Sequence, residues 1–157
     1  KQASQSLIFG SMLIIDYAFD ANRYYRASRS NGTIMTYRNQ IASSNLLFQP
    51  GYWDMTSHLC LDILRFYADK NKWNHLGEVR QGQALLALGL AQRLNALQKL
   101  PNNQLDVALE TRETLLRLVD PFSLGDFMWI AFEIDNVSKS MDDNIHISSR
   151  FLTQPIA

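Results

Sequence analysis

The amino-acid sequence predicts an all-α fold, a single-domain bundle of about six helices with short connections. Apolar residues recur at three- and four-residue steps along most of the chain, as they do on the buried face of a helix. Proline, glycine and asparagine separate these stretches, and only residues 145–147 suggest a short extended segment. The 157 residues, 46% of them hydrophobic, suffice for one globular domain with its own core.

The first three helices are expected at residues 3–28, 33–47 and 54–70. The apolar positions of the first are Leu7, Ile8, Met12, Ile15 and Phe19. Asn31 and Gly32 form a turn signal after this helix. Asp54 is a suitable N-cap for the third helix, because its carboxylate can accept a hydrogen bond from the first turn.

The other three helices are expected at residues 74–100, 105–119 and 123–137. Pro101 ends the fourth helix and Pro121 the fifth, because the residue before a proline avoids the α region. Ser123 begins a sequence that resembles a capping box, which is typical of a helix start. We therefore expect residues 1–140 to form a helical bundle and residues 141–157 to form an irregular C-terminal tail.

The cysteine content and the apolar stretches indicate where the protein is found. Cys60 is the single cysteine, which excludes an intrachain disulfide and makes the cytoplasm the expected location. The longest apolar stretch, residues 7–19, is interrupted by polar side chains and is shorter than the roughly 20 residues of a spanning helix, so no membrane association is expected. The chain begins at Lys1 instead of methionine, which leaves a fragment, a processed product and part of a longer protein all open.

Candidate metal ligands are few. His58 and Cys60 are two residues apart, whereas His58 and Asp62 are four apart and would share a helix face. A structural zinc site has four such ligands at close spacing, and no second pair accompanies these. We therefore expect no metal.

Catalytic motifs are also missing from the sequence. Asp16 and Asp20 could form a carboxylate pair, but Arg23 provides an ordinary ion-pair partner for Asp20. The chain has no Gly-x-Ser-x-Gly elbow, no Gly-x-x-x-x-Gly-Lys phosphate loop and no Gly-x-Gly-x-x-Gly fingerprint. The sequence predicts no catalytic residue, no cofactor and no enzyme. An unfamiliar helical active site stays an alternative that a perturbed pKa of Asp16 or His58 would favour.

The charges are distributed unevenly, although 15 basic and 15 acidic side chains give a net charge of zero. Residues 1–100 hold eleven basic and six acidic side chains, whereas residues 101–157 hold four basic and nine acidic ones. Residues 21–53 contain no acidic side chain at all. A neutral total excludes a bulk polycation, but it is compatible with one basic surface and one acidic surface.

The acid-free stretch contains the candidate nucleic-acid-binding residues Arg23, Tyr24, Tyr25, Arg26, Arg29 and Arg38. Guanidinium groups contact phosphates bidentately, and aromatic rings stack on unpaired bases. The same arginines would also complement the dipole at the end of the first helix, and the tyrosines would then belong to the core. The pattern indicates phosphate-backbone contact without sequence specificity.

The expected sixth helix contains the candidate protein-interface residues Phe127, Trp129 and Phe132. Together with Met128 and Ile130 they surround that helix on nearly all sides. Such a helix is either central in its own fold or covered by another chain.

The arginine- and tyrosine-rich segment on a small all-α chain resembles the small subunit of a CRISPR effector complex of the Cascade type. The matching positions are the six candidate nucleic-acid-binding residues. The resemblance implies a non-catalytic subunit, in several copies per complex, that contacts a guide–target duplex or a displaced single strand and other protein subunits. The neutral net charge departs from that family, whose small subunits are expected to be basic.

A second resemblance is local. Trp73, Leu76 and Gly77, followed by Gly89, Ala96 and Pro101, are similar to one tetratricopeptide repeat. Arg80 and Arg93 replace the aromatic residues of the motif, and no second copy occurs 34 residues away. This resemblance implies a helical module for protein–protein interaction without a nucleic-acid role.

The sequence thus predicts a non-catalytic, nucleic-acid-binding subunit of a cytoplasmic nucleoprotein complex, with a role in antiviral defence implied by the CRISPR resemblance. The alternative function is a helical protein-interaction module.

Overall fold

Strands as well as helices build this protein, and the predicted all-α bundle is wrong. The computed structural model describes residues 2–135 and 151–153. Within them the strands form three sheets, in the orders β1-β8-β7, β2-β6 and β4-β3-β5. The chain divides into two compact units, one of Lys1–Ile15 with Ala68–Ala157 and the other of Asp16–Tyr67. The predicted boundary at residue 141 lies outside the described residues.

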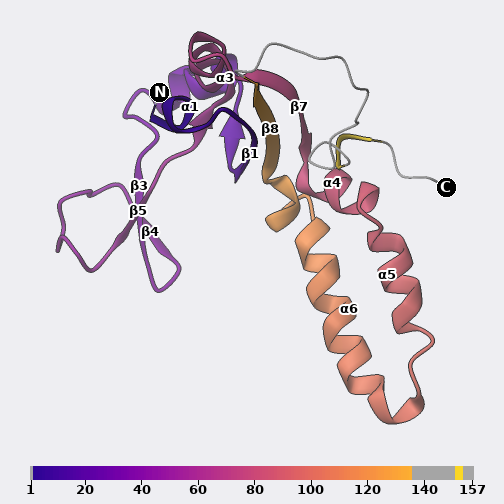
Figure 1. Ribbon diagram of the computed structural model, residues 1–157. Coiled ribbons are helices and arrows are strands. Elements are labelled where there is room, and N and C mark those ends of the chain that lie inside the picture. Colours follow the sequence, from indigo (N-terminus) through magenta and orange to yellow (C-terminus); the bar gives the residue numbers. More distant parts are fainter. Residues whose placement is uncertain (1, 136–150, 154–157) are drawn as a thin grey trace. The chain divides into compact units, whose positions relative to one another are not determined.

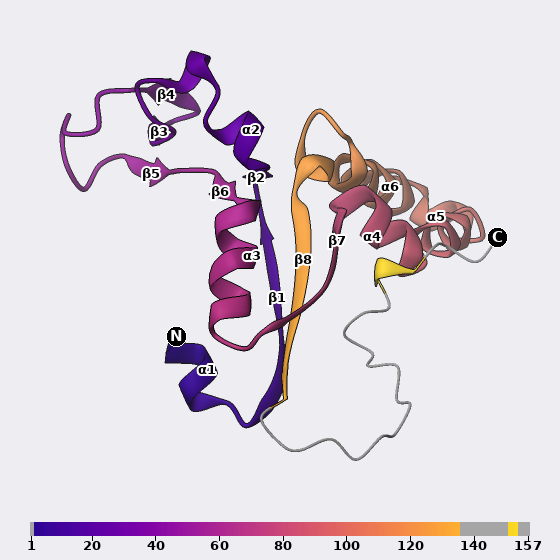
Figure 2. The ribbon, with the colours of Figure 1, turned by 90° about the horizontal axis from the view of Figure 1, so that it is seen from above.

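The first unit contains a three-stranded sheet of β1 (Phe9–Asp16), β8 (Met128–Asp135) and β7 (Asn74–Arg80), which Figure 2 shows with β8 in the middle. β7 and β8 are antiparallel, with Arg80 opposite Met128 and a bulge between His75 and Gly77. The side chains of Ile130, Phe132 and Ile134 on β8 are almost completely buried. The apolar β8 therefore forms the centre of this unit.

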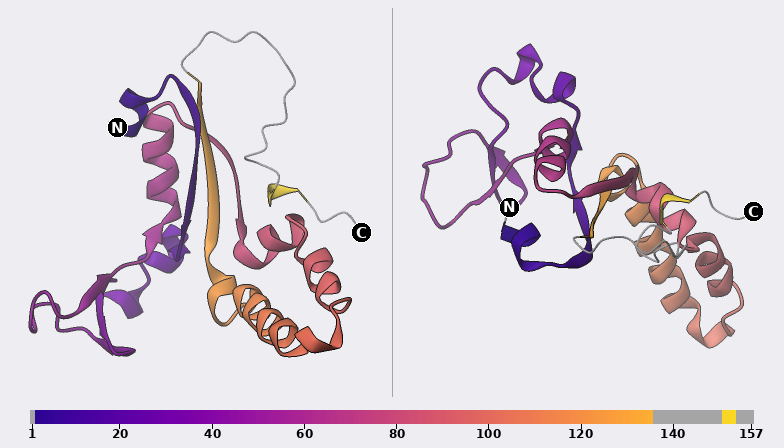
Figure 3. Two further views of the ribbon diagram at one scale, coloured as in Figure 1. Left: turned by 60° about the horizontal axis from the view of Figure 1, so that its bottom comes forward. Right: turned by 45° about the horizontal axis from the view of Figure 1, so that its top comes forward.

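The helices of the first unit are α1 (Gln2–Ser6), α4 (Gln81–Ala87), α5 (Leu90–Leu97), η2 (Asn102–Gln104), α6 (Leu105–Val119) and η3 (Leu124–Asp126). α5 and α6 lie side by side as a hairpin (Figures 1 and 3). Ala84 on α4, Ala131 on β8 and Phe151 form a core cluster, against which Leu76, Val79, Trp129 and Leu152 pack.

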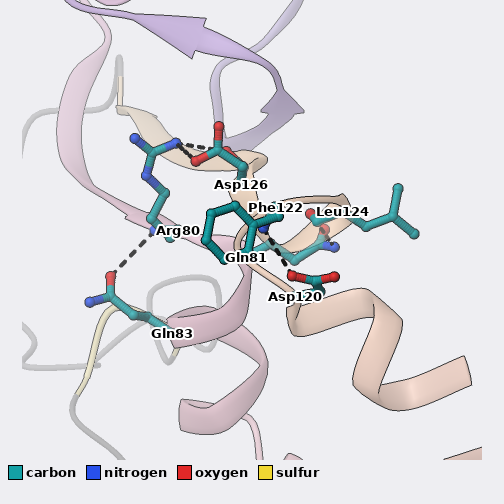
Figure 4. Close-up of polar contacts among 7 residues, drawn as sticks. All are labelled: Arg80, Gln81, Gln83, Asp120, Phe122, Leu124 and Asp126. Carbon is teal, nitrogen blue, oxygen red and sulfur yellow. Dashed lines mark hydrogen bonds and ion pairs between the residues drawn. The ribbon is translucent and has the colours of Figure 1, made fainter. Parts of the chain in front are cut away.

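Gln81 connects three of these elements at the junction of β7 and α4 (Figure 4). Its buried amide nitrogen donates to the carbonyl oxygens of Leu118 and Leu124, both at 2.9 Å, and its oxygen accepts from Nε1 of Trp129 at 3.1 Å. Beside it, Arg80 Nη1 forms an ion pair with Asp126 Oδ1 at 2.5 Å.

The second unit contains the parallel pair β2 (Ala18–Phe19) and β6 (Leu59–Cys60), and the antiparallel sheet of β3 (Met35–Arg38), β4 (Ile41–Ser43) and β5 (Asp54–Thr56). Its helical segments are α2 (Ala21–Tyr24), η1 (Ala27–Arg29) and the first part of α3 (Leu61–Lys70). Thr36 is 1% exposed, and its hydroxyl donates to the Ser43 carbonyl at 3.0 Å. Nε1 of Trp53 is buried and has no hydrogen-bond partner among the described residues.

The first two predicted helices are wrong. Residues 3–28 contain α1, β1, β2, α2 and η1 in succession, and residues 33–47 contain β3 and β4. Apolar spacing in the short segment around β1 fits a strand as well as a helix, and pairing with the distant β8 decides between the two. The sixth predicted helix is wrong for the same reason, since its described part forms η3 and the central strand β8.

The third and fourth predicted helices are partly correct. Within residues 54–70, β5 and β6 come first, and α3 then ends at Lys70 as expected. Within residues 74–100, β7 is followed by α4 and α5, which Gly89 separates in a left-handed conformation with φ of 98°. The fifth predicted helix is confirmed as α6.

Two further expectations concern the tail and the membrane. The predicted extended segment at residues 145–147 and most of the predicted tail lie outside the described residues. Across residues 2–135 and 151–153, every helix is too short or too polar to span a bilayer.

Candidate functional site

A pocket of about 370 Å³ lies within the second unit, lined by Tyr17, Tyr37, Thr56, Ser57 and His58. Three segments that are distant in the sequence supply these residues. Tyr17 follows directly after β1 and Tyr37 lies on β3. Thr56 ends β5, and Ser57 and His58 connect β5 to β6. The pocket therefore depends on both sheets of this unit.

Backbone pairing fixes one wall of the pocket. The parallel pairing of β2 with β6 places Ala18 opposite Leu59 and Phe19 opposite Cys60. The Leu59 amide also donates to the Tyr17 carbonyl at 2.8 Å. Tyr17 and His58, which precede these two strands, are thereby held next to each other with ring centroids 6.0 Å apart.

His58 is half-buried and stacks on the Phe19 ring, with centroids 4.3 Å apart and planes inclined by 15°. Stacking restricts the orientation of the imidazole, so one ring edge keeps a constant direction in the pocket wall. An imidazole ring has nitrogen atoms that can accept or donate a proton, and among the lining side chains only His58 has one.

A series of hydroxyl groups supports the segment that carries Ser57 and His58. The Tyr24 and Thr33 hydroxyls share a hydrogen bond of 3.1 Å, and the Thr33 and Ser57 hydroxyls share one of 2.9 Å. Ser57 Oγ also donates to the His58 carbonyl at 3.3 Å. These hydrogen bonds connect α2 to the segment that carries His58. The pocket is therefore lined by both aromatic and hydroxyl groups.

The six predicted nucleic-acid-binding residues all lie in the second unit, but not on one helix. Arg23 and Arg29 lie over the Phe19 ring, with Cζ atoms 4.2 and 4.4 Å from its centroid. Arg38 donates to Gln49 at 2.9 Å and lies 5.6 Å from the Tyr52 ring. The remaining three residues are Tyr24 and Tyr25, whose rings contact each other edge to face at 4.9 Å, and Arg26, which precedes η1.

The three predicted protein-interface residues lie in the first unit. Phe132 is completely buried in β8, so its side chain is not at the surface. Trp129 packs on Phe151 with centroids 5.4 Å apart and donates to Gln81. Phe127 precedes β8 and is half-buried.

The carboxylates considered in the sequence analysis accept hydrogen bonds from backbone amides. Asp16 accepts from the Tyr17 amide at 2.7 Å, and Asp20 caps α2 by accepting from the Arg23 amide at 2.7 Å. Asp62 accepts from the Ala21 amide at 2.6 Å. No group of three or more potential metal ligands occurs in the part of the chain that the structure describes.

Sequence reasoning missed the pocket. It considered His58 as a metal ligand and as a residue whose perturbed pKa would favour an unfamiliar active site. It placed Tyr37 only within the acid-free stretch of residues 21–53, and it assigned no role to Tyr17, Thr56 and Ser57. A signal was present in the polar run Thr56-Ser57-His58 directly before an apolar segment. Such a run also fits a connection between elements, and connections often carry binding residues.

The arrangement defines an α/β protein with an aromatic and hydroxyl-lined pocket in one of its two units. Residues 1–79, half of the chain, match the family described as “Putative S-adenosyl-L-methionine-dependent methyltransferase”. The chain belongs to this family. No curated protein matches it.

Two crystal structures of proteins from Burkholderia thailandensis, both of one superfamily, share the fold. An uncharacterised protein has a TM-score of 0.73 at 23% identity, over 88% of this chain and 36% of that chain. A second member, bound to S-adenosyl-homocysteine, has a TM-score of 0.69 at 23% identity, over 84% of this chain and 33% of that chain. The chain thus spans about a third of the length of these structures.

These findings correct the functional predictions. The chain is not a CRISPR small subunit, because it belongs to the family that matches residues 1–79 and its fold combines helices with strands. Membership of this family also contradicts the prediction of a non-catalytic nucleic-acid-binding protein. Nothing supports the tetratricopeptide-like alternative, since the motif that begins at Trp73 runs along strand β7 instead of a helix.

Proposed function

We propose that the protein is an S-adenosyl-L-methionine-dependent methyltransferase and that the pocket of the second unit receives the methyl acceptor. The observation that carries this proposal is the family match over residues 1–79, which includes all five pocket residues. The structural neighbour bound to S-adenosyl-homocysteine, the product that such a reaction leaves, supports it further.

The position of the pocket along the chain also supports the proposal. Residues that bind ligands lie disproportionately on the connections between rigid elements. Tyr17 directly follows the carboxyl end of β1 and lines the pocket. A residue at this position is well placed to contact a substrate.

The pocket fits an acceptor better than it fits the cofactor. S-adenosyl-L-methionine carries a ribose diol and a charged amino-acid end, which call for carboxylate and other charged partners. The five lining side chains are two tyrosines, two aliphatic hydroxyls and one imidazole. We therefore assign these residues to the acceptor and none of them to the cofactor.

The lining groups account for the proton that the reaction releases. The cofactor, when bound, supplies an electrophilic methyl group, and an oxygen or nitrogen acceptor that takes it up loses one proton. The imidazole of His58 is the lining group whose chemistry suits a general base. The hydroxyls of Tyr17, Tyr37, Thr56 and Ser57 can orient the acceptor by hydrogen bonds.

Calorimetric titration of the natural full-length protein with S-adenosyl-homocysteine tests the proposed function. We expect saturable binding at one site, and His58→Gln should leave it unchanged. With S-adenosyl-L-methionine and an extract of the source cells, His58→Gln should lower methyl transfer about 100-fold, the usual contribution of a general base.

His75→Gln is the matched control, because His75 lies in the first unit, where it pairs with Glu78. This variant should transfer methyl groups at the rate of the unmodified protein. Failure of S-adenosyl-homocysteine to bind at millimolar concentration would refute the proposed function. Full methyl transfer by His58→Gln would refute the role of His58.

A further inference from the structure

Two positive charges lie against one aromatic ring in the second unit. The guanidinium carbons of Arg23 and Arg29 are 4.2 and 4.4 Å from the centroid of the Phe19 ring. His58 stacks on the same ring. Since both distances refer to one centroid, the two guanidinium groups are closer to each other than a Debye length of about 10 Å, and salt screens their repulsion only weakly.

Local structure holds both arginines in these positions. Asp20 caps α2, which fixes the backbone at Arg23. Arg29, the last residue of η1, donates a hydrogen bond from Nη1 to the Arg23 carbonyl oxygen. The pair therefore results from the turn between α2 and η1 and does not require a bound ligand to form.

Nearby carboxylates are engaged elsewhere. Asp20 accepts from the Arg23 backbone amide, and Asp62 accepts from the Ala21 amide and pairs with Arg65 at 3.3 Å. Residues 21–53 contain no acidic side chain. Among the residues that the structure describes, neither Arg23 nor Arg29 forms an ion pair with a carboxylate.

We propose that Arg23 and Arg29 form an anion site that binds a phosphate or carboxylate group of the methyl acceptor. Guanidinium groups bind such oxyanions through paired N–H donors, and an anion between them would replace repulsion with attraction. The Phe19 ring joins this site to the pocket, because His58 contacts the ring and lines the pocket. The identification of the ligand as the acceptor rests on the proposed function, whereas the anion site itself does not.

Thermal unfolding of the natural full-length protein in increasing inorganic phosphate tests the site, with chloride used to keep the ionic strength constant. Phosphate should raise the unfolding midpoint in a saturable manner, because a ligand that binds the folded state stabilises it. The double variant Arg23→Gln/Arg29→Gln should weaken the apparent affinity for phosphate at least 10-fold. Acetate in a parallel titration shows whether a carboxylate is also accepted.

The matched control is Arg26→Gln/Arg38→Gln. It removes the same charge from the same acid-free stretch, but Arg26 occupies the N-cap position of η1 and Arg38 lies over the Tyr52 ring. The control should respond to phosphate as the unmodified protein does. If the control loses the response equally, or if the Arg23→Gln/Arg29→Gln variant retains it, the site is refuted.

A second variant separates binding from folding. Arg23→Lys/Arg29→Lys keeps both charges and loses the paired donors, so it should fold and bind phosphate several-fold more weakly. Unchanged affinity in this variant contradicts a built guanidinium site.

Calorimetry with S-adenosyl-homocysteine distinguishes the two proposals. If the unmodified protein binds S-adenosyl-homocysteine but does not respond to phosphate, only the anion site is refuted. A phosphate response without S-adenosyl-homocysteine binding refutes only the proposed function.

Discussion

At the scale of single residues, Gln81 is a buried polar side chain with three hydrogen-bond partners in the first unit. It satisfies the carbonyls of Leu118 and Leu124 and the indole of Trp129, and it is 8% exposed. These carbonyls lie at and after the end of α6, where the helix leaves its last carbonyl groups without intrahelical donors. One amide thus joins α6, η3 and β8.

Gln81→Ala should lower the free energy of unfolding by about 2 kcal/mol, because it leaves several partly buried polar groups without a partner. Urea denaturation measures this difference. Gln83→Ala is the control, because Gln83 is exposed and makes one long hydrogen bond of 3.4 Å to the Arg80 amide. An equal loss in both variants contradicts the role of Gln81.

At the scale of elements, two glycines, Gly82 and Gly125, lie close to Val119 at the end of α6. A Cβ atom on Gly125 would lie 2.4 Å from the Val119 carbonyl oxygen, whereas one on Gly82 would lie 3.3 Å from it. The first distance is impossible without a backbone shift, and the second requires only a small adjustment. Close approach of the chain, more than turn geometry, therefore requires glycine at position 125.

Gly125→Ala should lower the free energy of unfolding by about 3 kcal/mol through overpacking. Gly82→Ala should have an effect near zero, because better helix propensity in α4, about 1 kcal/mol, offsets the tighter contact. Thermal and urea denaturation of both variants test this contrast. Equal effects of the two substitutions would show that the Val119 carbonyl does not restrict position 125.

Elements also show how far the sequence predicts the fold. α6 was predicted correctly because 15 residues contain enough turns for the helical period to be distinctive. β8 was predicted as a helix because a central strand is apolar on both faces, and its buried run resembles a helix interior. β3, β4 and β5 have only three or four residues each, and long-range pairing stabilises them in a way that no local pattern reports.

At the scale of the whole molecule, the two units differ in how much of their sheet is buried. Most residues of β8 are buried, whereas all three residues of β5 are exposed. Local opening exposes backbone amides most readily where few apolar contacts oppose it. Hydrogen exchange should therefore be slowest in β8.

Hydrogen–deuterium exchange followed by mass spectrometry should find the amides of Ile130–Ile134 at least about 100-fold slower than those of β4 and β5. The α5–α6 hairpin should exchange at intermediate rates, since α5 and α6 contact each other and α4 but expose Leu105 and Leu109. Equal protection of β5 and β8 would contradict this order.

Only part of the candidate site was predictable from the sequence, because the rest depends on the pairing of segments that are distant along the chain. Arg23 and Arg29 were identified from the acid-free composition, which is a local property. The pocket was not, because Tyr17, Tyr37 and His58 come together only through the pairing of β2 with β6 and of β3 with β5.

The buried indole nitrogen of the half-buried Trp53 has a spectroscopic consequence. Its N–H donates no hydrogen bond among the described residues, so little solvent relaxation follows excitation and its fluorescence should be shifted to the blue. Trp73 and Trp129 lie in the other unit, and Trp129 donates to Gln81. In the variant Trp73→Phe/Trp129→Phe, the tryptophan fluorescence would come from the second unit alone. Its emission wavelength would then change when that unit partly unfolds.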